Sequence, residues 1–127
     1  MAINPSVALR LLRRRPDISS EEFHRYWREQ HGPLVASHAH TLGIRRYSQL
    51  HATDSRFGAS IAQARDCEPS DWDGIALVWF DGEEALVAAG ATPEGQAAGA
   101  ALLEDERRFI DLPRCQLFLS DDHSVVH

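Results

Sequence analysis

The stretch that decides the fold is EEFHRYWREQHGPLVASHAH, Glu21 to His40, which has the pattern of an amphipathic helix. Phe23, Trp27 and Leu34 recur at a spacing that places them on one face of a helix. A serine just before the segment is a candidate for the N-cap. A helix with one apolar face needs a partner surface, so we expect this segment to pack on a sheet.

The helix pattern is interrupted at Gly32-Pro33, directly after a histidine. Pro33 lacks a backbone N–H and disfavours helical geometry at Gly32, so we expect a kink or a restart just after His31. A neutral imidazole can take or give a proton near physiological pH, which makes His31 the first candidate for a general acid–base. The alternative is that His31 caps the broken helix end, and the two roles are compatible.

The other segments of the chain have strand or helix patterns. We expect strands over 7–14, 44–51, 72–81 and 114–120, a short helix over 82–90, a longer helix over 93–111 and a long loop over 52–71. The order of the main elements is strand, helix, strand, strand, helix, strand, which is the βαββαβ order of the ferredoxin-like fold. The sequence therefore predicts a single α+β domain over 1–127, with a four-stranded antiparallel sheet and both helices on one face.

The opposite face of such a sheet has no helix to cover it. The strands place apolar side chains there, namely Val7, Leu9, Leu11, Leu77 and Trp79 or their alternates. An exposed apolar face of this size favours association, and two sheets that face each other would enclose a barrel-shaped space. We therefore expect a homodimer in the form of a dimeric α/β barrel.

Composition and motifs limit the classes of partner. The 127 residues carry a net charge of -6, whereas phosphate backbones are bound by lysine and arginine, so nucleic acid is not an expected partner. No apolar window approaches the ~20 residues of a membrane span, and the N-terminus lacks a signal-peptide pattern, so we expect a cytoplasmic protein that does not enter a membrane. His24, His31 and His38 are seven residues apart, about 10 Å along a helix, and the two cysteines are far apart, so no metal site is expected.

Several further residues are candidates for a ligand site. Tyr47, Gln49 and His51 share one face of the second strand and could orient an apolar ligand, although an ordinary exposed face is the alternative. Asp73 precedes a glycine and is either a turn residue or a carboxylate that orients His31 or His51. The remaining candidates are His38 as a pocket residue and Trp27, Trp79 and Phe118, expected in the core or as aromatic walls of a pocket.

The last helix ends with carboxylates. Asp105 and Glu106 lie where a negative charge opposes the helix macrodipole. We therefore expect each to have a partner, such as Arg108 or an N–H elsewhere, and to serve ion pairing rather than catalysis.

Three motifs resemble those of the EthD family, within the dimeric α+β barrel superfamily. In FHRYWREQHGP, the residues Phe23, Trp27, His31 and Pro33 match the family's F-x3-W-x3-H-x-P pattern. WDGIALVWF is similar to its DG signature in the third strand, and LLEDERRFID to its segment before the last strand. One departure is Leu77, where members often carry a glutamate, so a polar role at that position is not carried over.

The resemblance implies a ferredoxin-like protomer, a homodimer and a cleft within each sheet–helix layer. Relatives act without metal or organic cofactor on small hydrophobic molecules, often aromatic or polyketide-derived, and others are accessory proteins of oxidative degradation pathways. We therefore expect a cofactor-independent enzyme that acts by proton transfer on such a molecule, as a dehydratase, isomerase, cyclase or decarboxylase. His31 would be the acid–base, with Tyr47, His51 or Asp73 orienting it. The alternatives are a monooxygenase-like enzyme, a non-catalytic binding or accessory protein, and haem binding as in more distant cousins.

Overall fold

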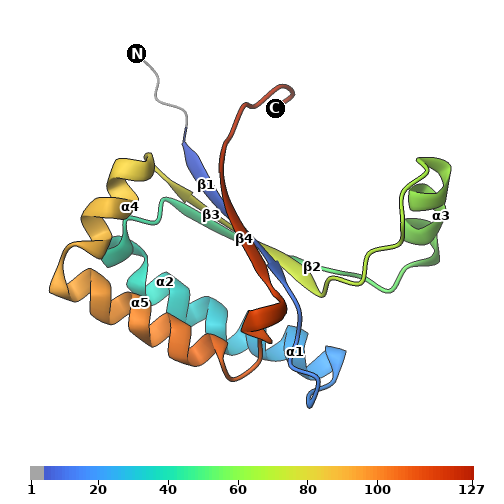
Figure 1. The fold of residues 1–127 in the computed structure, drawn as a ribbon, viewed down its shortest axis with the longest axis horizontal. Coiled ribbons are helices and arrows are strands. Elements are labelled where there is room, and N and C mark those ends of the chain that lie inside the picture. Colours follow the sequence, from blue (N-terminus) through green and yellow to red (C-terminus); the bar gives the residue numbers. More distant parts are fainter. Residues whose placement is uncertain (1–4) are drawn as a thin grey trace.

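The computed structural model describes residues 5–127 and contains a four-stranded antiparallel sheet with helices on one face (Figure 1). The strands are β1 (Ser6–Leu12), β2 (Arg46–His51), β3 (Gly74–Phe80) and β4 (Gln116–Asp121). They lie in the order β2-β3-β1-β4, and each neighbouring pair is antiparallel. The predicted α+β class with a ferredoxin-like order of elements is confirmed.

Two long helical segments form the second layer. The first consists of α1 (Ser20–Tyr26), the π-helical turn η1 (Trp27–His31) and α2 (Gly32–Leu42). The second consists of α4 (Glu83–Gly90) and α5 (Pro93–Glu106), followed by the 3-10 turn η2 (Leu112–Arg114). Figure 1 shows α2 and α5 side by side on one face of the sheet. Within residues 5–127 no helix is both long and apolar enough to cross a membrane.

Pro33 changes the first helix without ending it. The N–H of Gly32 donates to the carbonyl of Trp27, five residues back, so the turn just before Pro33 is a π turn. The side-chain amide of Gln49 donates to the same carbonyl at 2.9 Å, and a glycine at position 32 leaves room for it. The kink or restart expected after His31 is thus a widened turn, and the helix continues through it because a second donor satisfies the displaced carbonyl.

The core lies where the first helical segment crosses the sheet. Phe23 and Trp27 are 0% and 1% exposed and pack with Leu12 of β1 and Phe109 after α5. Gly74 at the start of β3 permits this packing, because a Cβ there would lie 2.5 Å from Cζ3 of Trp27. The DG step at the start of the third strand therefore has a steric reason: the indole lies directly on the backbone.

The segment 52–71, expected to be a loop, contains a helix, α3 (Arg56–Ala64). The Ser55 hydroxyl accepts the N–H of Gly58 at 3.4 Å and caps it. Figure 1 shows α3 standing away from both layers, and Phe57 on it is 73% exposed. The loop prediction was wrong because Phe57 and Ile61 form only a single i, i+4 apolar pair, which is too short a pattern to indicate a helix.

Some predicted boundaries were also wrong. The first strand ends at Leu12 rather than at residue 14, because its neighbour β3 begins at Gly74, which pairs with Leu12. Arg14 forms only an isolated bridge with Ile110. The last helix ends at Glu106 rather than at residue 111, since the chain turns there toward β4.

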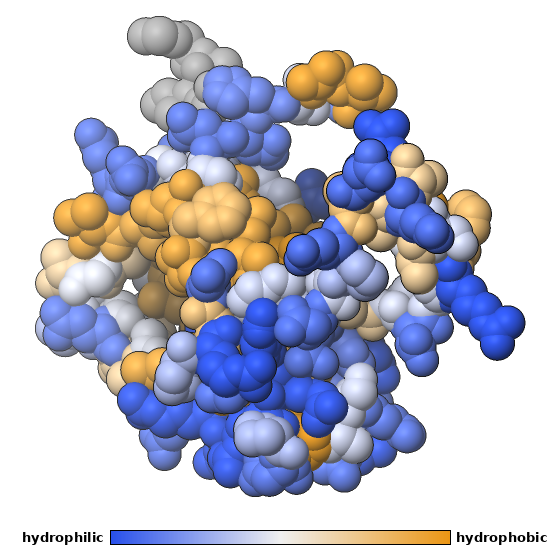
Figure 2. Space-filling model, turned by 45° about the vertical axis from the view of Figure 1, so that its right-hand side comes forward, coloured by the Kyte–Doolittle hydropathy of each residue, from blue (hydrophilic) through white to orange (hydrophobic). Residues whose placement is uncertain are grey.

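The face of the sheet opposite the helices is apolar and partly open. Leu50 and Phe118 are 49% and 50% exposed on this face. Of the residues predicted to lie on this face, Val7 is buried, and the others are partly exposed, namely Leu9, Leu11, Leu77 and Trp79. The guanidinium of Arg46 covers the ring of Trp79, 4.6 Å from its centroid. Figure 2 shows a broad apolar region in the middle of the molecular surface, as expected for a sheet face without a helix layer.

Candidate functional site

A cavity of about 420 Å³ lies between the sheet and the helix layer. Most of its wall is apolar and includes Ala8, Val35, Ala76, Val78, Phe80, Leu86 and Leu102. Four polar side chains also line it, namely Arg10, His31, Tyr47 and Glu106. An apolar wall with a few convergent polar groups is the usual form of a site for a small apolar molecule.

His31 lies at the end of the π turn, and its side chain is 5% exposed. Its Nδ1 is 2.8 Å from Oδ2 of Asp105 on α5. Because an ionised carboxylate only accepts hydrogen bonds, Nδ1 carries the hydrogen and Nε2 of the neutral ring is left as a base. The nearest carboxylate oxygen to Nε2 is Oε2 of Glu106 at 3.9 Å, which is too long for a hydrogen bond. The ring therefore presents a free lone pair at the cavity wall.

Asp105 is held from its other side by a tyrosine. The hydroxyl of Tyr26 donates to Oδ1 of Asp105 at 2.6 Å. Burial, and then the hydrogen bond to Asp105, raises the pKa of Tyr26 above its ordinary value, so the phenol stays protonated and remains a donor. Both oxygens of Asp105 are thus engaged, which fixes the carboxylate and, through it, the tautomer and orientation of His31.

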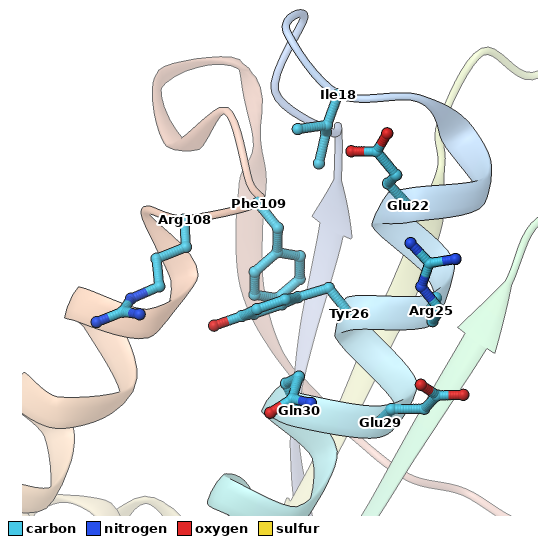
Figure 3. Close-up of a pocket in the computed structure, with 8 residues that line it drawn as sticks. All are labelled: Ile18, Glu22, Arg25, Tyr26, Glu29, Gln30, Arg108 and Phe109. Carbon is cyan, nitrogen blue, oxygen red and sulfur yellow. The ribbon is translucent and has the colours of Figure 1, made fainter.

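Figure 3 shows the outer side of this arrangement, where Tyr26 lies between the first helix and Phe109. A groove of about 240 Å³ surrounds it, with the charged side chains Glu22, Arg25 and Glu29 on one side and Arg108 on the other. Nε of Arg108 is 3.9 Å from Oδ1 of Asp105, and the Arg108 side chain is mostly exposed. The groove is lined by charged side chains, whereas the cavity wall is mostly apolar, and the chain Tyr26–Asp105–His31 links the two.

Arg10 and Glu106 form an ion pair in the cavity wall. Arg10 is on β1, in the centre of the sheet, and its Nη1 is 2.7 Å from Oε1 of Glu106 at the end of α5. Glu106 is buried, and Arg10 supplies the opposite charge beside it. The expectation that Glu106 serves an ion pair agrees with this contact, although the partner is Arg10 and not the neighbouring Arg108.

A second chain of polar groups runs along β2. Nδ1 of His24 and Nδ1 of His51 are 2.7 Å apart, and Nε2 of His51 is 2.8 Å from Oε1 of Gln49. Nε2 of Gln49 is 3.1 Å from the hydroxyl of Tyr47, which lines the cavity. Burial, and then the charge of His24, lowers the pKa of His51 to about 4, so His51 is neutral at pH 7. The three candidates on this strand face are therefore joined to one another, and only Tyr47 reaches the cavity.

Asp73 directly precedes β3 and lies beside the end of β1. Its Oδ2 accepts the backbone N–H of Arg14 at 2.8 Å, and its Oδ1 is 3.6 Å from Nε of Arg14. Among the described residues, no hydrogen bond joins Asp73 to His31 or His51. Asp73 thus holds the end of β1 through the backbone of Arg14.

The remaining candidates divide between the two faces of the sheet. Trp27 lines the cavity, and its ring also packs against His51. Trp79 and Phe118 are on the open face, and neither lines the cavity. His38 is a partly buried residue of α2 outside the cavity lining. In residues 5–127 no group of three or more His, Cys, Asp or Glu side chains is placed to hold a metal ion.

Sequence reasoning missed the carboxylate that orients His31. Asp105 was assigned to ion pairing, and Tyr26 and Arg10 were not candidates. The signal for Arg10 was available, since an arginine inside an otherwise apolar strand needs a buried anion. Asp105 gave no such signal, because its contact with His31 depends on how α5 packs against η1.

Comparison with known proteins gives a family and a set of similar structures. A family model described as the EthD domain matches residues 15–113. A comparison with curated proteins gives no significant match. An EthD family protein from Bacillus halodurans superposes with a TM-score of 0.62 at 18% identity, covering 94% of this chain and 99% of that one.

Two other similar structures are described by their assembly or by their activity. A dimeric protein with a ferredoxin-like fold from Bacteroides fragilis has a TM-score of 0.59 at 13% identity, with 93% and 96% of the two chains covered. SnoaB, a cofactor-independent oxygenase from Streptomyces nogalater, has a TM-score of 0.56 at 14% identity, with 97% of each chain covered. At these identities the likeness extends to the fold, and the match over 15–113 goes further: the chain belongs to the EthD family.

Proposed function

We propose that this protein is a cofactor-independent enzyme that binds a small, largely apolar molecule in the internal cavity and transfers a proton through Nε2 of His31. The observation that carries the proposal is the 2.8 Å contact between Nδ1 of His31 and Asp105 at the wall of an apolar cavity. A buried imidazole with one nitrogen fixed by a carboxylate and the other free has the form of a general base with its orienting group.

The proposed step is a proton transfer that the residues of the chain can balance. Nε2 of His31 takes a proton from an acidic C–H or O–H bond of the ligand, and the electron pair of that bond stays on the ligand. The imidazolium is stabilised by Asp105 at Nδ1 and by Glu106, 3.9 Å from Nε2. The same nitrogen then returns the proton to a different atom, to a leaving group or to solvent. Isomerisation, dehydration, cyclisation and decarboxylation all use this sequence, and the choice among them depends on the ligand.

An oxygenase is the second candidate reaction, supported by the similar fold of SnoaB, described as a cofactor-independent oxygenase. A proton acceptor in an apolar cavity serves this reaction as well, because removal of a proton makes the ligand more electron-rich. Consumption of dissolved oxygen during turnover separates it from the reactions above.

A binding or accessory protein is the alternative from another class. It is supported by the apolar character of the cavity, which favours retention of a ligand as much as turnover. A binding protein would not speed up proton exchange of a bound ligand, so both the wild-type chain and His31→Gln would give the rate seen in buffer alone. In an enzyme, the same substitution lowers the rate far more than the affinity.

The test uses a probe with weakly acidic C–H bonds, since the natural ligand is not needed to detect a base. 2-Tetralone is incubated in D2O buffer with the protein, and loss of its α-proton signals is followed by NMR. We expect exchange above the buffer rate with the wild-type chain and with His40→Gln, a variant at an exposed histidine of α2. We expect the buffer rate with His31→Gln. Equal rates for wild type and His31→Gln would contradict the proposal.

We also propose that the chain acts as a homodimer that buries the open face of the sheet. The partly exposed Leu50 and Phe118 on that face support it, as do similar structures described as dimeric, from Bacteroides fragilis and Thermobifida fusca. Light scattering after size exclusion should give about twice the mass of the chain, and Phe118→Asp should shift it toward the monomer. Wild-type protein that stays monomeric at about 100 micromolar, roughly a hundred thousand times a dissociation constant of about 1 nM, would contradict it.

A further inference from the structure

The hydroxyl of Tyr47 is the end of the polar chain on β2, and it is the member that lines the cavity. It accepts two hydrogen bonds, from Nε2 of Gln49 at 3.1 Å and from Nε1 of Trp27 at 3.3 Å. Both partners donate through nitrogen. The direction of the hydroxyl's own hydrogen therefore depends on whether either partner could instead accept a hydrogen bond from Tyr47.

Neither partner can accept the Tyr47 hydrogen, because the donor role of each is set by a group that can only donate or only accept. The indole nitrogen of Trp27 only donates. The backbone carbonyl of Trp27 only accepts, and Nε2 of Gln49 lies 2.9 Å from it, so the amide nitrogen of Gln49 has to face this side. Oε1 of Gln49 then faces Nε2 of His51 at 2.8 Å, which requires a hydrogen on that nitrogen. The neutral ring of His51 accepts at Nδ1 from Nδ1 of His24, which closes the chain consistently.

The hydrogen of Tyr47 is therefore left without an acceptor in the described part of the chain. The two donors occupy the acceptor side of the oxygen, and no described residue accepts from it. Burial raises the pKa of Tyr47 above its ordinary value, so the hydrogen is retained across the physiological range. A buried O–H donor without a partner is costly, and the open direction at this residue is the cavity.

We propose that Tyr47 donates a hydrogen bond to an oxygen of the ligand, so that the ligand class is a largely apolar molecule with a carbonyl group. This inference deepens the proposed function and rests on its assignment of the cavity as the ligand site. In the proposed reaction, the same O–H would stabilise the negative charge that collects on the carbonyl oxygen when His31 removes a neighbouring proton.

The experiment compares two probes of the same shape, 2-acetonaphthone and 2-isopropenylnaphthalene, which differ by a carbonyl oxygen in place of a methylene group. Their dissociation constants are measured by quenching of tryptophan fluorescence in the wild-type chain and in Tyr47→Phe. We expect Tyr47→Phe to weaken binding of the ketone by about fivefold to tenfold and to leave binding of the alkene unchanged. Unchanged alkene binding also shows that the variant is folded.

A second variant tests the direction of the hydrogen while keeping the tyrosine. Gln49→Glu replaces the amide donor by a carboxylate of the same shape, which accepts the Tyr47 hydrogen and turns it away from the cavity. The carboxylate also no longer donates to the Trp27 carbonyl, so unchanged binding of the alkene is required to show that the turn is intact. We expect this variant to lose the preference for the ketone as Tyr47→Phe does, whereas Gln63→Glu on α3, an exposed glutamine, retains it.

Two results would overturn the inference, and they separate it from the proposed function. If both probes bind and Tyr47→Phe weakens them equally, Tyr47 is only part of the wall, and the role of His31 is unaffected. If neither probe binds to the wild-type chain, the cavity is not a ligand site, and both proposals fail. A selective loss of ketone binding without tetralone exchange would support the inference and refute catalysis by His31.

Discussion

Replacing Asp105 by asparagine tests the acid–base pair most directly. The carboxylate accepts Nδ1–H of His31 at 2.8 Å, with the two side chains 15% and 5% exposed. A hydrogen bond to a charged group in such a setting contributes about 1.5–3 kcal/mol. Because this bond strengthens when His31 takes up a proton, most of its energy should appear in the rate, and we expect exchange to slow by about 10- to 100-fold.

Asparagine has a second effect in the same direction. Its amide nitrogen can donate to Nδ1 of His31, which moves the ring hydrogen to Nε2 and removes the free base from the cavity. The assay is deuterium exchange into 2-tetralone, together with the affinity for the same ketone. Glu104→Gln is the matched control, since this exposed carboxylate precedes Asp105 on α5 and should change neither quantity.

The refuting result is a protein that binds the ketone normally and exchanges its protons at about the wild-type rate after Asp105→Asn. The orientation of His31 would then not depend on the carboxylate, and the ring would act through another group or not at all. A loss of both rate and affinity would instead indicate that Asp105 holds the packing of α5 on η1, and the rate alone would carry no information about the base.

Three further predictions concern stability, and urea unfolding measures each of them. Glu106→Gln leaves Arg10 without its anion, 2.7 Å away, in a buried wall, so the free energy of unfolding should fall by about 2 kcal/mol, while Glu104→Gln should leave it unchanged. Gly74→Ala places a Cβ 2.5 Å from the Trp27 ring and should cost about 1–3 kcal/mol. Burial holds the pKa of His51 at about 4, below its ordinary 6.5, so the folded chain binds fewer protons than the unfolded chain between these values. The contribution of His51 to the free energy of unfolding should therefore be fully present above pH 6.5. It should fall by about 1 kcal/mol between pH 7 and pH 5, after allowance for solvent screening of this partly exposed ring. A variant His51→Gln that shows the same fall would assign it to other groups.

The order of elements could be predicted because the apolar periodicities on both layers are strong. Phe23 and Trp27 share a helix face, and the apolar runs of β1 and β3 are long enough to indicate buried strands. The helix α3 could not be predicted, since none of its residues is buried and its apolar pattern is correspondingly short. Packing produces the periodicity that sequence reasoning detects, and α3 has little packing.

The site was only half predictable, and the reason is the alternation of side chains along strands. Tyr47, Gln49 and His51 were grouped correctly by parity on one strand. Trp79 was expected on the open face of the sheet and lies there, and Phe118, expected in the core or in a pocket wall, lies on the same face. A shift of one residue moves a side chain to the opposite face of a sheet, so residue type alone does not assign a pocket wall.

The π turn connects the two polar chains that enter the cavity. Its widened hydrogen-bond pattern leaves the carbonyl of Trp27 shared between the N–H of Gly32 and the amide of Gln49, and that amide in turn fixes Tyr47. His31 closes the same turn and meets Asp105 on α5. An uninterrupted α-helix would return the Trp27 carbonyl to the N–H of His31, four residues on, and would remove the acceptor that orients Gln49. The Gly32-Pro33 step therefore does more than bend the helix, because one irregular turn positions His31 on one wall of the cavity and the Tyr47 hydroxyl on the other.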